Sequence, residues 1–127
     1  MTDFVNATEL LALAQSINHD ERCDTCASLN YPGWESIPAV FDQKTLKLVG
    51  TLKIEDAPES WDEYHPNGTE IWSPEAPIAI GYHPYNRCDL YQCIDCSRIY
   101  LRYTEFGGYY VDQRIRALNA KLLVLPK

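Results

Sequence analysis

The sequence predicts an α+β fold, in which a mostly antiparallel sheet of hairpins carries one N-terminal helix and a four-cysteine site ties the N-terminal segment to the central hairpin. Apolar residues recur at helical spacing near the N-terminus, whereas later segments alternate between apolar and polar residues and are bounded by turn residues. Two Cys-x-x-Cys pairs complete the pattern. At 127 residues the chain is expected to form one domain, residues 1–127.

Residues 8–17 are predicted to form the helix. Asn6 or Thr8 is a candidate cap for its first turn, and Glu9 suits the positive end of the helix dipole. The apolar side that we expect to pack on the core consists of Leu10, Leu11, Leu13, Ala14 and Ile17.

A first hairpin is predicted from a strand at 37–41, a turn at 42–45 and a strand at 46–54. Gly50 marks a candidate β-bulge in the second of these strands. That strand is expected to place its alternating apolar residues on one face, namely Leu46, Leu48, Leu52 and Ile54.

Further strands are predicted at 78–82, 99–105 and 109–118. Gly107-Gly108 separates the last two strands and signals a hairpin turn. The apolar spacing from 111 onward also fits a helix, but a strand as far as residue 116 is the preferred interpretation.

The two cysteine pairs, Cys23-x-x-Cys26 and Cys93-x-x-Cys96, have the spacing of metal-binding turns. Zinc bound by thiolates takes four ligands in a closed tetrahedron, and each turn supplies two converging sulfur atoms. We therefore expect one Zn²⁺ held by all four cysteines, which would stabilise the domain. At these residues the chain resembles a zinc ribbon or a rubredoxin-like pair of knuckles, with an insertion far longer than the ~15–20 residues usual between the pairs.

Other roles for these cysteines stay open. A Cys-x-x-Cys pair also serves as a redox dithiol or a disulfide, but residues 98–103 after the second pair have a strand pattern rather than the helix that lowers thiol pKa values in redox proteins. Cys88 is expected to be a free, partly buried thiol. The residues that could replace a ligand are Cys88, His19, His65 and His83, and those that could bind a sulfur atom through hydrogen bonds are Arg22 and Arg98.

Residues 55–77 are expected to form an irregular insertion, with room for one helical turn at 58–64. This insertion contains no lysine or arginine, and its acidic residues account for the whole net charge of −7. The residues expected to bind a partner are Glu55, Asp56, Glu59, Trp61, Asp62, Glu63, Tyr64, Glu70 and Trp72. The alternative is a solvated acidic loop whose aromatic residues hold it against the sheet.

These features favour a small acidic binding protein whose expected partner is a basic protein, such as a toxin or a nuclease. Carboxylates would steer the partner and aromatic residues would anchor it. Residues 91–118, with the hairpin at 102–110, resemble small bacterial immunity proteins of the contact-dependent growth inhibition type. That resemblance implies an immunity or antitoxin role through direct binding. The alternatives are a zinc-ribbon adaptor in a larger protein or RNA assembly and a thiol/zinc redox sensor.

Several other function classes are disfavoured. Nucleic-acid binding requires a basic surface, and the only candidate is a small strip of Arg98, Arg102, Arg114 and Arg116. No nucleophile–base pair or open metal site is recognisable, so we expect no catalysis. No segment reaches the ~18 apolar residues of a membrane span, and no secretory signal is evident, which together favour a cytoplasmic protein.

Overall fold

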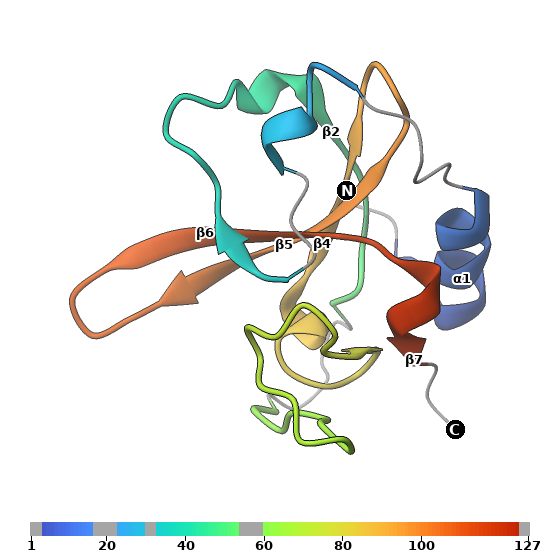
Figure 1. The fold of residues 1–127 in the computed structure, drawn as a ribbon, viewed down its shortest axis with the longest axis vertical. Coiled ribbons are helices and arrows are strands. Elements are labelled where there is room, and N and C mark those ends of the chain that lie inside the picture. The colour runs from blue at the N-terminus through green and yellow to red at the C-terminus, as the bar shows by residue number, and fades with distance from the viewer. Residues whose placement is uncertain (1–3, 17–22, 30–32, 54–59, 125–127) are drawn as a thin grey trace.

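The computed structural model describes residues 4–16, 23–29, 33–53 and 60–124, and Figure 1 shows how its elements are arranged. A five-stranded antiparallel sheet has the order β1-β6-β5-β4-β2. Its strands are β1 (Glu35–Ser36), β2 (Leu46–Thr51), β4 (Asp89–Cys93), β5 (Ile99–Phe106) and β6 (Val111–Ala117). The other elements are the helix α1 (Ala7–Ser16), a parallel pair of β3 (Ile78–Ala79) with β7 (Leu123–Val124), and the short 3-10 helices η1 (Ala27–Leu29), η2 (Gln43–Thr45), η3 (Tyr85–Arg87) and η4 (Ala120–Leu122). The predicted α+β class is confirmed.

The helix α1 begins at a reciprocal cap. The Glu9 amide donates to Asn6 Oδ1 at 2.8 Å, and the Asn6 amide donates to Glu9 Oε1 at 3.3 Å. Two of the four otherwise unpaired amide donors at the start of the helix are thereby satisfied. Leu10 and Ala14 are buried against the sheet, so the predicted helix is confirmed, with Asn6 rather than Thr8 as its cap.

The central strand β5 separates two hydrophobic cores. Ile99, Leu101 and Tyr103 point into the larger core, which also contains residues of α1. Tyr100 points the opposite way, into a smaller core with Cys26 and Cys93. Because side chains alternate across a strand, β5 is buried on both faces, and the four-cysteine region packs on the face opposite α1.

The first predicted hairpin is wrong. β1 pairs with β6, and β2 pairs with β4, so the two segments do not pair with each other. The Ile37 amide still donates to the Gln113 carbonyl of β6 at 3.1 Å, and residues 38–41 then turn, with the Phe41 amide donating to the Pro38 carbonyl at 3.0 Å. Pro38 lacks an amide proton, which makes a continuous ladder at this position unfavourable.

The predicted bulge at Gly50 is confirmed, because the register between β2 and β4 shifts between Leu48 and Gly50. This shift breaks the expected single apolar face. Leu46 is buried in the smaller core and Leu52 in the larger one, whereas Leu48 remains 43% exposed. Ile54 lies outside the described residues.

The hairpin of β5 and β6 is confirmed, and the Gly107 amide donates to the Tyr110 carbonyl at 2.8 Å in its turn. The strand expected at 78–82 is shorter, because it consists of β3 alone. Residues 60–77 form turns without a helix or strand, so the helical turn suggested at 58–64 is absent from its described part, 60–64. In the described parts of the chain, no helix is long and apolar enough to cross a membrane.

Candidate metal centre and partner surface

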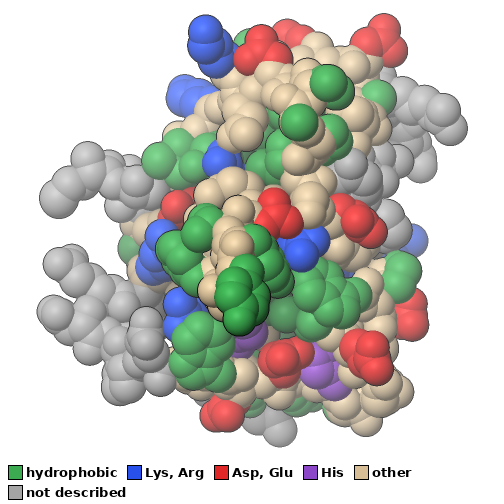
Figure 2. All heavy atoms as spheres, turned by 90° about the vertical axis from the view of Figure 1, so that its left-hand side faces the viewer, with side chains coloured by type: hydrophobic (Ala, Val, Ile, Leu, Met, Phe, Trp, Pro, Cys, Tyr) green, Lys and Arg blue, Asp and Glu red, His purple; other side chains and the backbone are tan. Residues whose placement is uncertain are grey.

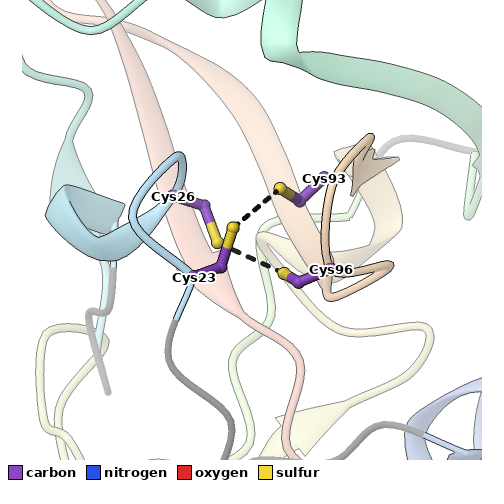
Figure 3. Close-up of side chains that lie close together, drawn as sticks. All are labelled: Cys23, Cys26, Cys93 and Cys96. Atoms are coloured by element: carbon purple, nitrogen blue, oxygen red, sulfur yellow. Dashed lines mark hydrogen bonds between the residues drawn. The ribbon is translucent and has the colours of Figure 1, made fainter.

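The four cysteines of the two pairs converge at one point, as Figure 3 shows. Their sulfur atoms all lie within 4.8 Å of one another. The Cys23 and Cys93 sulfurs are 3.7 Å apart, and the Cys26 and Cys96 sulfurs are 3.5 Å apart. Each of these close contacts joins one knuckle to the other, so the N-terminal segment is tied to the hairpin of β4 and β5.

The second knuckle is the turn between β4 and β5. Cys93 ends β4, its amide donates to the Arg98 carbonyl at 2.9 Å, and its carbonyl accepts from the Ser97 amide at 3.0 Å. Ser97 has a φ of 65°, the left-handed conformation that closes this tight turn. The turn therefore places both Cys93 and Cys96 on the same side of the hairpin end.

The first knuckle is held by packing and by one bond across the site. The Leu29 amide of η1 donates to the Cys26 carbonyl at 2.9 Å, and Leu29 is fully buried in the smaller core. Thr25 Oγ1 donates to Asp95 Oδ2, which joins the middle residues of the two knuckles. These contacts position the knuckles independently of any ion.

The sulfur positions fit a metal ion bound by four thiolates. A tetrahedron with metal–sulfur bonds of about 2.3 Å has sulfur–sulfur edges of roughly 3.8 Å. The two shortest observed separations, 3.5 and 3.7 Å, are close to that edge. They are far longer than the ~2.05 Å of a disulfide bond. Four close cysteines of this geometry could bind one metal ion.

The surroundings of the sulfur atoms favour thiolates unequally. The Cys26 amide, which faces the Cys23 sulfur, lowers the pKa of the Cys23 thiol to about 7. Burial raises the pKa of the Cys26 thiol and also that of the Cys96 thiol, although the Arg98 amide partly opposes this at Cys96. A metal ion must therefore displace protons from the buried thiols, as thiolate ligands generally require.

The environment of Tyr100 also favours a thiolate, rather than a thiol, at Cys26. Its hydroxyl is buried and has no hydrogen-bond partner in the described part of the chain. A buried hydroxyl without an acceptor is unfavourable. The hydroxyl lies close enough to Cys26 to lower the pKa of that thiol, and a metal-bound thiolate there would accept its proton.

Tyr100→Phe is expected to weaken metal binding by about tenfold while leaving the fold intact, because loss of a hydrogen bond to a metal ligand typically has that effect. Competition with a chromophoric chelator would measure the affinity. Tyr103→Phe is a matched control, since Tyr103 lies on the same strand and points into the opposite core. Equal affinities of wild type and Tyr100→Phe would contradict a role for this hydroxyl.

The other candidate ligands lie elsewhere. Cys88 is fully buried, more so than expected, and its thiol donates to the Pro84 carbonyl at 3.3 Å; burial raises its pKa. His65 and His83 are not among the clustered ligands, while His19 and Arg22 lie outside the described residues. Arg98 is buried and contributes its backbone amide to the site.

His65 is held within the insertion by two polar contacts. Its Nε2 is 2.8 Å from Glu63 Oε1, and its Nδ1 is 2.8 Å from Thr69 Oγ1. These three residues do not line the large cavity described below. The contacts fasten the turn at 65–68, where the Gly68 amide donates to the His65 carbonyl.

The aromatic residues of the insertion pack on β6 and on the segment before β4, and they remain partly exposed. Trp61 lies under the Arg87 guanidinium at 3.9 Å and is 63% exposed, and Trp72 lies under Arg114 at 4.8 Å and is 44% exposed. Tyr64 stacks on Tyr82. The aromatic residues thus hold the insertion against β6 and against residues 82–87, and part of their surface stays exposed. Asp62, Glu63 and Glu70 are exposed beside them, whereas Glu55, Asp56 and Glu59 lie outside the described residues.

A second exposed apolar surface lies at the tip of the β5–β6 hairpin and was not predicted. Figure 2 views the molecule from the side toward which this hairpin extends and shows hydrophobic side chains gathered there, flanked by charged ones. The exposed residues of the tip are Phe106, Tyr109, Tyr110 and Val111. The sequence signal was the Tyr-Tyr-Val run beside Gly107-Gly108, since a hairpin tip has little core to pack against.

The suggested strip of four arginines does not form. Arg98 and Arg116 are buried, and Arg114 pairs with Glu105 and Asp112 at 3.5 and 3.3 Å. Arg102 lies opposite Ile115 in the ladder, so it projects from the other face of the sheet than Arg114. The structure therefore offers no continuous basic surface of these residues for RNA.

Comparison of the chain with protein-family models, curated proteins and solved structures gave no match. The resemblances to zinc ribbons and to immunity proteins gain no support from these comparisons. The functional assignment therefore depends on the geometry of the cysteine cluster and of the exposed surfaces.

Proposed function

We propose that this chain is a small acidic binding protein that neutralises a basic protein partner, in the manner of an immunity or antitoxin protein. The observation that carries the proposal is the pair of partly exposed tryptophans, Trp61 and Trp72, set among exposed carboxylates. Exposed tryptophans of this kind commonly anchor protein interfaces.

The insertion and the hairpin tip form one connected surface. Trp72 packs on Arg114, Arg114 pairs with Glu105, and Glu105 accepts a hydrogen bond from the Tyr110 hydroxyl. We call the residues Trp61, Asp62, Glu70, Trp72 and Tyr110 the acidic aromatic face. Its aromatic members would provide desolvated contacts, and its carboxylates would attract a cationic partner and speed association.

The proposed role of the metal centre is structural, and Zn²⁺ is the ion we assign to it. Four thiolates close a tetrahedral site, which leaves no open position for a substrate. The centre packs in the smaller core beneath β5 and β6, so it would hold the base of the hairpin whose tip carries Tyr110. A reducing cytoplasm, where thiols stay available for metal, is the expected location.

A basic toxin or nuclease is the partner class that this surface would suit, because such proteins expose a cationic cleft for nucleic acid. Binding would cover that cleft, and no chemical step by this chain is needed. The resemblance of residues 91–118 to immunity proteins of contact-dependent growth inhibition, which was drawn from the sequence alone, would imply the same class.

Neutralising the face with Asp62→Asn and Glu70→Gln is expected to slow association with a captured partner several-fold and to flatten its salt dependence, since steering acts through these charges. Trp61→Ala should instead speed dissociation, at a cost of about 2 kcal/mol in binding if Trp61 is an anchor. Affinity capture from cells of the source organism, followed by surface plasmon resonance at several salt concentrations, would measure both effects.

Asp24→Asn serves as the control, because Asp24 is an exposed carboxylate of the first knuckle, away from the face. It should leave association unchanged. If the captured partner bound the Asp62→Asn/Glu70→Gln variant and the Trp61→Ala variant as it binds wild type, the acidic aromatic face would not be the binding surface and the proposal would fail.

A further inference from the structure

A cavity of about 1070 Å³ lies apart from the cysteine cluster, lined by the first turn of α1, the residues after β2, the turn before β4, and parts of β4, β5 and β6. Its volume is slightly above the ~300–1,000 Å³ typical of small-molecule sites. Among the described residues that line it, three are cationic (Lys53, Arg87 and Arg102) and one is acidic (Asp89). This local balance is opposite to the net charge of −7 of the whole chain.

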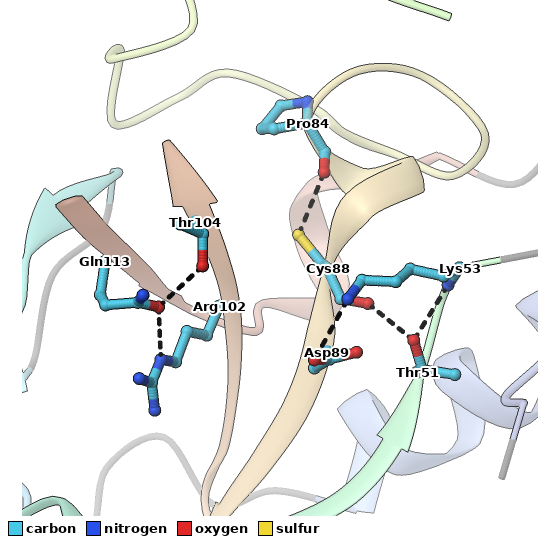
Figure 4. Close-up of polar contacts among 8 residues, drawn as sticks. All are labelled: Thr51, Lys53, Pro84, Cys88, Asp89, Arg102, Thr104 and Gln113. Carbon is cyan, nitrogen blue, oxygen red and sulfur yellow. Dashed lines mark hydrogen bonds and ion pairs between the residues drawn. The ribbon is translucent and has the colours of Figure 1, made fainter. Parts of the chain in front are cut away.

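Arg102 lines this cavity and is held in place by polar contacts, which Figure 4 shows. Its Nε donates to Gln113 Oε1 at 3.1 Å, and its guanidinium lies 5.0 Å from the centre of the Tyr91 ring. Thr104 Oγ1 donates to the same Gln113 oxygen at 3.2 Å. The side chain is therefore fixed through one edge and one face of the guanidinium before any ligand arrives.

The outer edge of the guanidinium remains available. In the part of the chain that the structure describes, no acceptor is bonded to the two terminal nitrogens of Arg102. Asp89 lies opposite Arg102 in the ladder, but its carboxylate pairs with Lys53 Nζ at 3.5 Å instead. Arg114 provides the contrast, because its guanidinium is paired with two carboxylates.

A planar fork of two free N–H groups matches the two oxygens of a carboxylate or a phosphate. The cavity is much larger than such a group, and aromatic side chains also line it, namely Phe4, Tyr91 and Phe106. We propose that this cavity binds a small organic anion, with its carboxylate or phosphate on Arg102 and an apolar body against the aromatic residues. This site is separate from the metal centre and shares no residue with the acidic aromatic face, but it adjoins that face, because Arg87 contacts Trp61 and Phe106 belongs to the hairpin tip.

The proposal is tested by titrating the purified, metal-loaded protein with phenyl phosphate, benzoate, phenol and benzylamine, followed by ¹H–¹⁵N NMR that includes the arginine Nε–Hε signals. At least one of the two anions should shift the signals of Arg102, Thr104 and Gln113, and the tighter one identifies the anionic group. Phenol and benzylamine should leave these signals unchanged at the same concentrations.

Arg102→Lys keeps the charge but loses the fork, so it should raise the Kd of the anion about tenfold or more. Lys47→Gln removes an exposed positive charge from β2 outside the cavity, and it should change the Kd by less than about twofold because screening weakens distant charges. The spectrum of each variant would confirm that the fold is kept. No shift with either anion, equal shifts with phenol, or equal affinity of wild type and Arg102→Lys would each overturn the proposal.

Discussion

Replacing Cys93 with serine is expected to abolish metal binding and to lower the free energy of unfolding by about 4 kcal/mol or more, as loss of a structural metal site commonly does. Cys93 is the last residue of β4 and is buried in the smaller core, and its sulfur is 3.7 Å from that of Cys23. Thermal unfolding with and without a chelator measures the effect. Chelation should destabilise wild type strongly and leave the serine variant almost unchanged.

Cys88→Ser is the matched control, because Cys88 is equally buried but lies outside the cluster. The new hydroxyl can still donate to the Pro84 carbonyl that the thiol contacts, so the expected cost is about 1 kcal/mol with no loss of metal. If chelation affected wild type and Cys93→Ser alike, the stabilising role of the cluster would be wrong.

Arg116→Met is expected to lower the free energy of unfolding by about 3 kcal/mol, measured by urea denaturation. Arg116 is fully buried and donates to the Tyr85 hydroxyl at 2.6 Å, to the Ala76 carbonyl at 2.7 Å and to the Pro74 carbonyl at 3.2 Å. These bonds fasten the end of the insertion and η3 to β6. Methionine fills similar space but leaves the buried Tyr85 hydroxyl and Ala76 carbonyl, and the partly buried Pro74 carbonyl, without this donor.

Arg114→Met is the control for this effect, since Arg114 lies two residues earlier on the same face of β6. Its ion pairs with Glu105 and Asp112 are partly exposed, and such pairs contribute about 0–1 kcal/mol. A cost for Arg116→Met no larger than that for Arg114→Met would show that the buried bonds do not hold the insertion in place.

The elements that could be predicted from the sequence are those built from local interactions. The cap at Asn6, the apolar spacing of α1 and the glycine turn between β5 and β6 all depend on residues close in the chain. The pairing of β2 with β4 could not be predicted in this way, because the partners are joined by the long insertion. Pairing there depends on burying Leu46 with Cys93 and Tyr100, a tertiary contact.

The same distinction between local and tertiary interactions applies to the candidate sites. The four cysteines were recognisable because each Cys-x-x-Cys pair is a local pattern, and the fold only has to bring the two pairs together. Arg102 had no such signal, since its setting depends on the register that places Gln113 opposite Thr104 and Tyr91 opposite Tyr100. The exposure of Leu48 could likewise not be predicted from the sequence, because the bulge at Gly50 determines which face of the strand each leucine occupies.

Zinc K-edge X-ray absorption of protein purified under reducing conditions tests most directly whether Cys23, Cys26, Cys93 and Cys96 hold one Zn²⁺. The expected result is four sulfur neighbours at about 2.3 Å, with one zinc per chain by elemental analysis. A nitrogen or oxygen neighbour at about 2.0–2.1 Å would show that another ligand takes the place of one of these cysteines. Zinc-free protein that is fully stable, with all its thiols open to titration, would contradict the metal centre itself.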